Sequence, residues 1–139
     1  MTETSTVDIR KAGAVILKDR HFLVTRARGK DIFVAPGGKL ESGETDQDAL
    51  VRELQEEVQV RVDADNLEHL STFTALAAGD ESRIVEMQVF LVNQPISDPV
   101  PSSEIEEILW VNTKTNGVAM GSIFEHDVMP LLKEKDLID

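Results

Sequence analysis

Apolar residues along the chain repeat with two different periods, and this pattern predicts strands and helices in alternation. In residues 84–92, apolar side chains occupy nearly every second position, which is the period of a half-buried strand. Further strands are predicted at residues 12–17, 22–25, 32–35, 67–78 and 108–111. Loops are predicted at residues 18–21, 79–82 and 94–103, with a turn at Pro36-Gly37-Gly38.

Two segments have the helical period instead. Residues 45–58 form the clearest predicted helix, because Thr45 can cap it and Asp48, three residues later, completes a capping box. A second helix is predicted over residues 120–132, where Pro130 should end or kink it. The order of strands and helices predicts an α+β fold, in which helices cover a mixed sheet.

Length and charge narrow the classes of protein. The 139 residues fit a single domain, predicted to span residues 9–139 after a loose tail at residues 1–8. With 26 acidic and 14 basic residues, the formal charge is −12. A field of that sign repels nucleic-acid backbones, so a nucleic-acid-binding module is excluded. A phosphate ligand would need a cation as a bridge.

Other classes are excluded by what the sequence lacks. It has no cysteine, which rules out disulfides and thiol nucleophiles. It has no signal-peptide pattern and no apolar run of the ~20 residues that span a bilayer. We therefore expect a cytoplasmic protein that does not contact a membrane.

The first predicted helix carries an acidic face. Glu53, Glu56 and Glu57 fall within an arc of roughly 100° by helix geometry. Like charges at this spacing cost a few tenths of a kcal/mol, which Arg52 can partly relieve by pairing with Glu56. The remaining repulsion suggests a cation, and oxygen ligands favour Mg²⁺, Mn²⁺ or Ca²⁺ over zinc. An acidic stripe alone is more often a solvated surface, so the preceding segment decides the interpretation.

The acidic helix belongs to a longer pattern with fixed spacing. Gly38 is followed after five residues by Glu44, and after seven more by Arg52-Glu53-Leu54-Gln55-Glu56-Glu57-Val58-Gln59-Val60. This resembles the Nudix box, G-x5-E-x7-R-E-U-x-E-E-x-G-U with U apolar, at every fixed position except Gln59. The sequence is therefore identified as a member of the Nudix hydrolase family, in its MutT-like group.

The resemblance implies a fold, a cofactor and roles for the residues of the box. The fold would be an α/β/α sandwich, and the reaction a hydrolysis that depends on Mg²⁺, with Mn²⁺ as the substitute. The implied metal ligands are Glu53, Glu56, Glu57 and the carbonyl of Gly37. Arg52 and Glu44 would hold the glutamates in place. Gln59 either takes the left-handed conformation of the missing glycine, at roughly 1 kcal/mol, or lets the helix run longer.

The general base varies within the family, so two sources stay open. One is Glu53, inside the box. The others are distant glutamates that precede Trp110, namely Glu104, Glu106 and Glu107. A solvated acidic start of a strand explains these three equally well.

The substrate is approached by elimination. Residues 71–77 lack the proline typical of subfamilies that cleave ADP-ribose, and the chain has no tyrosine, which dinucleoside-polyphosphate subfamilies carry. A nucleoside or deoxynucleoside triphosphate is therefore the leading small-molecule substrate. The alternatives are ADP-ribose or another nucleotide sugar, or a non-catalytic nucleotide-binding module. Because many members of the family dimerise, the resemblance also allows a homodimer.

Residues outside the acidic face are candidates for substrate contacts where they are basic or aromatic. Basic candidates for the phosphates are Arg26, Arg28 and Lys39, with solvated loop charges as the alternative. Aromatic candidates for stacking on a base are Phe33, Phe73, Phe90, Trp110 and Phe124, most of which are expected in the core.

Overall fold

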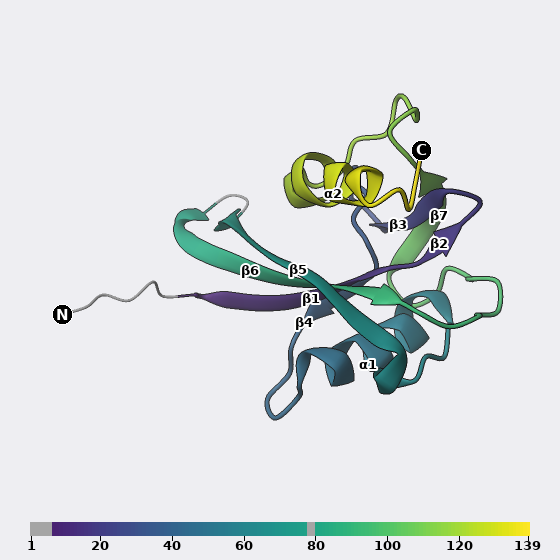
Figure 1. The fold of residues 1–139 in the computed structure, drawn as a ribbon. Coiled ribbons are helices and arrows are strands. Elements are labelled where there is room, and N and C mark those ends of the chain that lie inside the picture. The colour runs from purple at the N-terminus through teal and green to yellow at the C-terminus, as the bar shows by residue number, and fades with distance from the viewer. Residues whose placement is uncertain (1–6, 78–79) are drawn as a thin grey trace.

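The computed structural model describes residues 7–77 and 80–139 (Figure 1). The strands are β1 (Ile9–Val15), β2 (Leu17–Lys18), β3 (His21–Ala27), β4 (Gly37–Lys39), β5 (Leu67–Ala77), β6 (Asp80–Val92) and β7 (Ile105–Val111). The helices are α1 (Asp46–Val58), a 3₁₀ turn (Ala64–Asn66), a π-helical stretch (Phe124–Val128) and α2 (Met129–Glu134).

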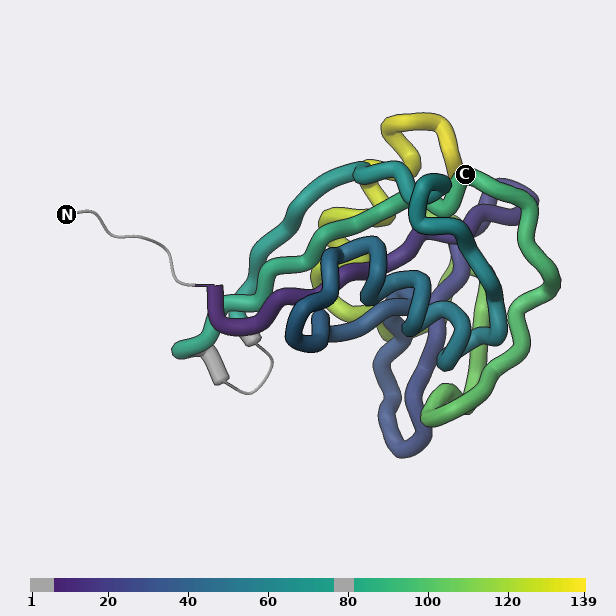
Figure 2. The backbone as a smooth tube through the Cα atoms, turned by 90° about the horizontal axis from the view of Figure 1, so that it is seen from below, coloured from purple at the N-terminus to yellow at the C-terminus, as the bar shows by residue number. Residues whose placement is uncertain are grey.

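The strands form two sheets that share no strand. The four-stranded sheet has the order β4-β1-β6-β5, and β1 runs parallel to β6 from Ile9 opposite Val85 to Val15 opposite Leu91. The three-stranded sheet has the order β2-β3-β7 and is antiparallel. Both views place the start of β1 beside the first half of β6 (Figures 1 and 2).

Helices cover both faces of the four-stranded sheet, with α1 on one side and α2 on the other (Figure 1). Side chains of β1 alternate between the two layers, as a strand requires. Ala12 and Ala14 pack in the core cluster that contains Leu50 and Leu54 of α1. Val15 packs in the other cluster, with Phe124 and the C-terminal helical residues. The expected α+β sandwich is confirmed, although its strands are divided between two sheets.

Helix α1 has the predicted start. Thr45 accepts a hydrogen bond from the Asp48 N–H, and the Asp48 side chain accepts one from the Thr45 N–H, so the capping box is confirmed. The helix ends at Gln59, which has φ 57° and ψ 36°. Gln59 therefore takes the left-handed conformation that the missing glycine would favour.

The first two predicted strands form a hairpin, but the first one is divided. Leu17 pairs with Phe22 and Lys18 with His21, as the loop at residues 18–21 predicts. The predicted strand at residues 12–17 breaks at Ile16, because β1 belongs to the four-stranded sheet and β2 to the other. Ala78 and Gly79, which belong to the strand and loop predicted around them, lie outside the described residues.

Two predictions around the glycine-rich segment are wrong. Residues 32–35 form single bridges instead of a strand, because neighbouring residues pair with different segments, Val34 with Thr25 and Phe33 with Met120. The predicted turn at residues 36–38 is in part strand β4, which pairs with β1. Glycine permits this approach, since a Cβ on Gly37, whose φ is +145°, would collide with the Ala12 carbonyl oxygen.

The C-terminal helix begins at residue 122 and continues to Glu134. Pro130 therefore does not end it. The π-helical stretch lies directly before Pro130, and the Met129 N–H bonds to the carbonyl of Phe124, five residues back. The proline ring would clash with the carbonyl four residues before it in a regular α-helix, and the wider turn relieves this clash.

Candidate active site

The glycine-rich strand β4 lies directly against the acidic face of α1. The Gly37 N–H donates a hydrogen bond to Glu57 Oε1 at 3.0 Å. A Cβ on Gly38 would collide with the carboxylate of Glu53. Gly37 and Gly38 thus bring the backbone of β4 into contact with two of the three glutamates, an approach that residues with side chains would block.

Arg52 connects the start of the box with the helix. Its Nε and Nη2 donate to the two carboxylate oxygens of Glu44 at 2.7 and 2.9 Å, a bidentate pair. Its Nη2 also donates to the Lys39 carbonyl at 3.3 Å. The expected contact with Glu56 is long, at 3.5 Å, so Glu44 is the principal partner. Glu44 in turn accepts the Glu41 N–H at 2.8 Å, and these bonds fix the loop between β4 and α1.

The carboxylates of the acidic face differ in burial and in protonation. Burial raises the pKa of Glu57 to about 8, and the neighbouring carboxylates add to this rise. Burial also raises the pKa of Glu53 to about 7, against the opposing charge of Arg52. Glu56 is about half exposed. Buried carboxylates beside one another favour either a proton or a cation as neutraliser.

The chemistry of these donors fits a hard divalent cation. Carboxylate oxygens are the ligands that Mg²⁺ and Mn²⁺ prefer. Glu57 is only 7% exposed, and its one backbone donor does not neutralise it. Within residues 7–77 and 80–139, no three acidic or histidine side chains converge on one point as they stand. Glu53 and Glu56 already adjoin each other, because both lie beside Nη1 of Arg52, at 3.6 and 3.5 Å.

The three distant glutamates have different surroundings. Arg26 donates to Glu106 at 3.0 Å and to Glu107 at 3.1 Å, so both of these carboxylates already have a cationic partner. Glu104 lies near the acidic face: after burial, its charge contributes to the raised pKa of both Glu53 and Glu57. The structure therefore brings Glu104, rather than Glu106 or Glu107, to the box.

The loop before β7 places Glu104 there by binding the end of α1. The Val100 N–H donates to the Val58 carbonyl, and the Ser102 N–H donates to the Glu57 carbonyl, both at 2.9 Å. The Ser102 hydroxyl donates to the Glu56 carbonyl. These donors satisfy helix carbonyls that have no partner inside the helix. Ser102 gave no sequence signal, because a capping loop is recognisable only once the two segments meet.

The three basic residues predicted to contact phosphates lie in different surroundings, and not all of them adjoin the acidic face. Arg26 is engaged by Glu106 and Glu107 and lies 5.8 Å from the centre of the Phe33 ring. The Arg28 guanidinium bonds to the Ser103 carbonyl at 3.4 Å, beside Glu104. Lys39 follows Gly38 directly and is exposed.

A pocket lies on the α2 side of the four-stranded sheet and extends to the glycines of β4. It consists of two adjoining hollows of about 180 and 90 Å³. Lys11, Met87 and Phe124 line both hollows, and we call the whole the β1 pocket. Gly37 and Gly38 line the smaller hollow, and Leu76, Ile123 and other largely apolar residues line the larger one.

Lys11 is the functional candidate that the sequence did not reveal. The only signal is its position two residues before Gly13 and four before Val15, on the strand phase that faces α2. A half-buried lysine at that phase is unusual, but the phase is defined only once β1 is paired.

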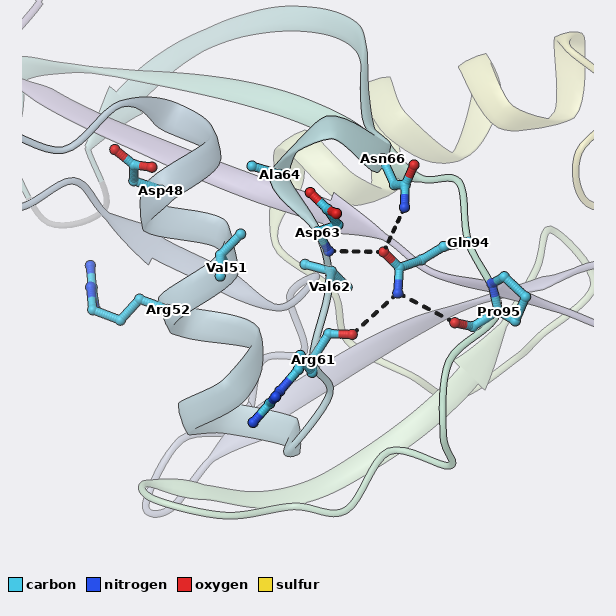
Figure 3. A pocket seen from close by; sticks show the side chains of 10 residues that line it. All are labelled: Asp48, Val51, Arg52, Arg61, Val62, Asp63, Ala64, Asn66, Gln94 and Pro95. Carbon is cyan, nitrogen blue, oxygen red and sulfur yellow. Dashed lines mark hydrogen bonds between the residues drawn. The ribbon is translucent and has the colours of Figure 1, made fainter.

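A larger hollow of about 880 Å³ lies elsewhere. None of the three glutamates lines it, although Arg52 does. The Gln94 side chain joins its walls: it accepts the Asp63 N–H at 2.9 Å and donates to the Arg61 carbonyl at 3.2 Å (Figure 3). Internal hydrogen bonds join the walls of this open hollow, and the candidate site remains the acidic face, where Glu57 meets the glycine backbone.

Comparison with known proteins gives the family. The model of the NUDIX domain matches residues 8–131. The chain belongs to the NUDIX family. The sequence-based identification is thereby confirmed, and the box from Gly38 to Val60 lies within the matched range.

Relatives of this NUDIX domain include proteins named as hydrolases. It is 34% identical over 92 residues to the 8-oxo-dGTP diphosphatase of Escherichia coli, covering 63% of this chain and 67% of that protein. It is 30% identical over 104 residues to an uncharacterized Nudix hydrolase of Bacillus subtilis, covering 73% of this chain and 64% of that protein. The chain thus spans about two thirds of the length of these relatives.

A solved structure supports the fold. The MutT NUDIX hydrolase of Burkholderia pseudomallei has a TM-score of 0.71 at 21% identity, covering 90% of this chain and 95% of that one. Within the described residues of the NUDIX domain, no helix is both long and apolar enough to cross a membrane.

Proposed function

We propose that this NUDIX domain is a divalent-cation-dependent hydrolase of nucleoside or deoxynucleoside triphosphates. The observation that carries the proposal is the contact of buried Glu57 and half-buried Glu53 with the two glycines of β4. The 34% identity to a protein named 8-oxo-dGTP diphosphatase supports the class of substrate.

Glu53, Glu56 and Glu57 would hold the cation, Mg²⁺ or Mn²⁺, with the Gly37 carbonyl as a further predicted ligand. When bound, the cation neutralises the oxygens of the phosphate chain and lowers the pKa of a water molecule. In a protein of charge −12, it also offsets the repulsion between the chain and its substrate.

Arg52 and Glu44 position the acidic face. Their bidentate pair holds the start of the loop to the middle of α1, so the carboxylates keep one orientation relative to β4. The strong hydrogen bond from Arg52 lowers the pKa of Glu44 to about 2. Glu44 therefore stays ionised at neutral pH and keeps Arg52 in place.

A carboxylate of this chain accepts the proton of the attacking water. The water oxygen forms a bond to one phosphorus, the bond from that phosphorus to the bridging oxygen breaks, and the other phosphate leaves with the electron pair. We propose Glu53 or Glu104 as the base. Glu53 touches Gly38, while Glu104 is exposed and free of the arginine that engages Glu106 and Glu107.

The β1 pocket would hold the nucleoside. It continues from Gly37 and Gly38 into largely apolar walls that include Phe124 and Met87. Apolar and aromatic walls with few polar groups are typical of small-molecule sites. When the phosphates of the substrate lie at β4, its base would thus enter the β1 pocket.

The test is a hydrolysis screen with Mg²⁺ and with Mn²⁺. Nucleoside triphosphates, deoxynucleoside triphosphates, ADP-ribose and nucleotide sugars are incubated with the protein, and phosphate products are identified by chromatography. Turnover of triphosphates that requires the cation is the expected result. Preferred turnover of nucleotide sugars would contradict the proposed substrate class. Saturable nucleotide binding without any turnover would show that the protein is a binding module and not an enzyme.

A further inference from the structure

Among the described residues that line the β1 pocket, Lys11 is the one with a charged side chain. It borders both hollows, and its neighbours there include Met87, Phe124 and Ile123. Burial lowers the pKa of Lys11, and the facing charge of Lys39 lowers it further. Within the described residues no carboxylate lies within 4.0 Å of the Lys11 ammonium. The Lys11 ammonium therefore has hydrogen-bond donors that no described carboxylate accepts, and a ligand bound in the β1 pocket can supply the acceptor.

Lys11 does not share a side of the sheet with the acidic face. Its neighbours on β1 at alternate positions, Gly13 and Val15, face Phe124 and the C-terminal helical residues. The intervening residue Ala12 packs with Leu50 and Leu54 of α1. The glutamates of α1 are also not among the charges that act on Lys11. Lys11 therefore lies away from the glutamates that would hold the cation and the phosphates, in the largely apolar β1 pocket.

The chemistry of an ammonium group selects among bases. Lysine has three donors and no acceptor. Guanine presents two acceptors, O6 and N7, on one edge, whereas adenine presents N7 beside the N6 donor. Uracil and thymine likewise present the O4 acceptor where cytosine presents the N4 donor. An amino group at the same place would meet a donor and leave both unpaired, which costs more than the missing bond alone.

We propose that Lys11 is a specificity-determining residue that selects keto bases, guanine and uracil or thymine, over amino bases. This inference rests on the proposed function, because it assumes that a nucleotide occupies the β1 pocket with its base away from β4.

The test compares matched pairs of substrates in the wild type and in Lys11→Met, which keeps the length of the side chain and removes the donors. We expect wild-type kcat/KM about tenfold higher for GTP than for ATP, and for UTP than for CTP. In Lys11→Met both ratios fall toward one, mainly through loss on the keto substrates. Lys135→Met, which removes an exposed lysine, is the control and keeps both ratios.

A second readout separates this inference from the proposed function. Equilibrium binding of GMP and AMP is measured without any divalent cation, in the wild type and in Lys11→Met. A preference for GMP that Lys11→Met abolishes supports the role of Lys11 even if no triphosphate is hydrolysed. Equal losses for GTP and ATP in Lys11→Met would overturn the inference and make Lys11 a phosphate contact. Absence of any keto preference in the wild type would also overturn it.

Discussion

The two faces of the four-stranded sheet are built in different ways. On the α1 face, the predicted metal ligands and the pair that positions them lie within one continuous segment, from Gly37 to Glu57, and Glu104 joins them from a distant loop. On the α2 face, the β1 pocket combines Lys11, Met87 and Phe124 from three distant segments. Under the proposed function, the metal ligands are therefore encoded in one local segment, whereas the selection of the ligand depends on tertiary packing.

The largest expected effect comes from removing the buried carboxylate of the α1 face. Glu57→Gln should lower kcat/KM on the order of 10³-fold, because it removes a predicted metal ligand while keeping the shape of the side chain. Phosphate release from a nucleoside triphosphate at saturating Mg²⁺ is the measurement. Glu68→Gln, the same charge change at an exposed position of β5, should leave the rate unchanged. Full activity in Glu57→Gln would remove the α1 face from the reaction.

The pairing of Arg52 with Glu44 should matter less than the ligands themselves. Arg52→Lys keeps the charge but loses the two parallel hydrogen bonds to Glu44. Activity should fall about 10–100-fold, with a higher Mg²⁺ concentration at half-saturation. Arg61→Lys is the matched control, at an exposed arginine outside the box. An unchanged Mg²⁺ dependence in Arg52→Lys would limit the pair to a structural role.

On the α2 face the expected effect is on binding. Phe124→Leu shortens a wall of the β1 pocket, so KM should rise about tenfold while kcat stays within about twofold. Steady-state kinetics over a range of triphosphate concentrations is the measurement. Phe73→Leu is the control, because Phe73 packs against the same core cluster but does not line the pocket. A fall in kcat at constant KM would contradict the assignment of substrate binding to the α2 face and of the reaction to the α1 face.

The pH dependence of stability distinguishes the faces without any substrate. The pKa of Glu57 is about 8 in the folded protein and 4.5 as the ordinary value, so the folded state binds the extra proton between these values. Stability of the cation-free protein should therefore fall as the pH rises from about 4.5 to about 8. Urea unfolding at several pH values gives the slope, which Glu57→Gln should reduce. The Glu68→Gln control should retain the wild-type slope.

The smallest effect concerns the end of α1. Gln59 has φ 57°, so Gln59→Gly should raise the free energy of unfolding by about 0.5–1 kcal/mol and leave activity unchanged. Gln55→Gly, at an exposed position inside the helix, should lower it by about 1 kcal/mol. Thermal unfolding of both variants checks the opposite signs. Destabilisation by Gln59→Gly would show that its side chain compensates for the strained backbone.

Local signals explain which elements were predictable from the sequence. The capping box of Thr45 and Asp48 depends on neighbouring residues and was correct. Residues 32–35 resemble a strand in composition, but only tertiary pairing decides whether a ladder forms, and here single bridges form instead. Likewise, Pro36-Gly37-Gly38 is a turn signal by composition, and its glycines instead allow β4 to approach β1.

The site shows the same division. The spacing of the box identified Glu44, Arg52 and the acidic face, because helix and loop geometry place them together within 20 residues. The roles of Ser102 and Lys11 depend on contacts between distant segments, and no pattern of neighbouring residues indicates them. For the same reason the sequence could not choose among Glu104, Glu106 and Glu107, which the position of Arg26 separates.

Calorimetric titration of Mn²⁺ into the wild type and Glu57→Gln tests the central role of the acidic face most directly. At pH 7 in two buffers of different ionisation enthalpy, the wild type should bind Mn²⁺ and release protons, because the raised pKa values of Glu57 and Glu53 leave these carboxyls partly protonated. Glu57→Gln should bind at least about tenfold more weakly and release fewer protons. Equal affinity and equal proton release in the two proteins would contradict the assignment of the cation to the acidic face.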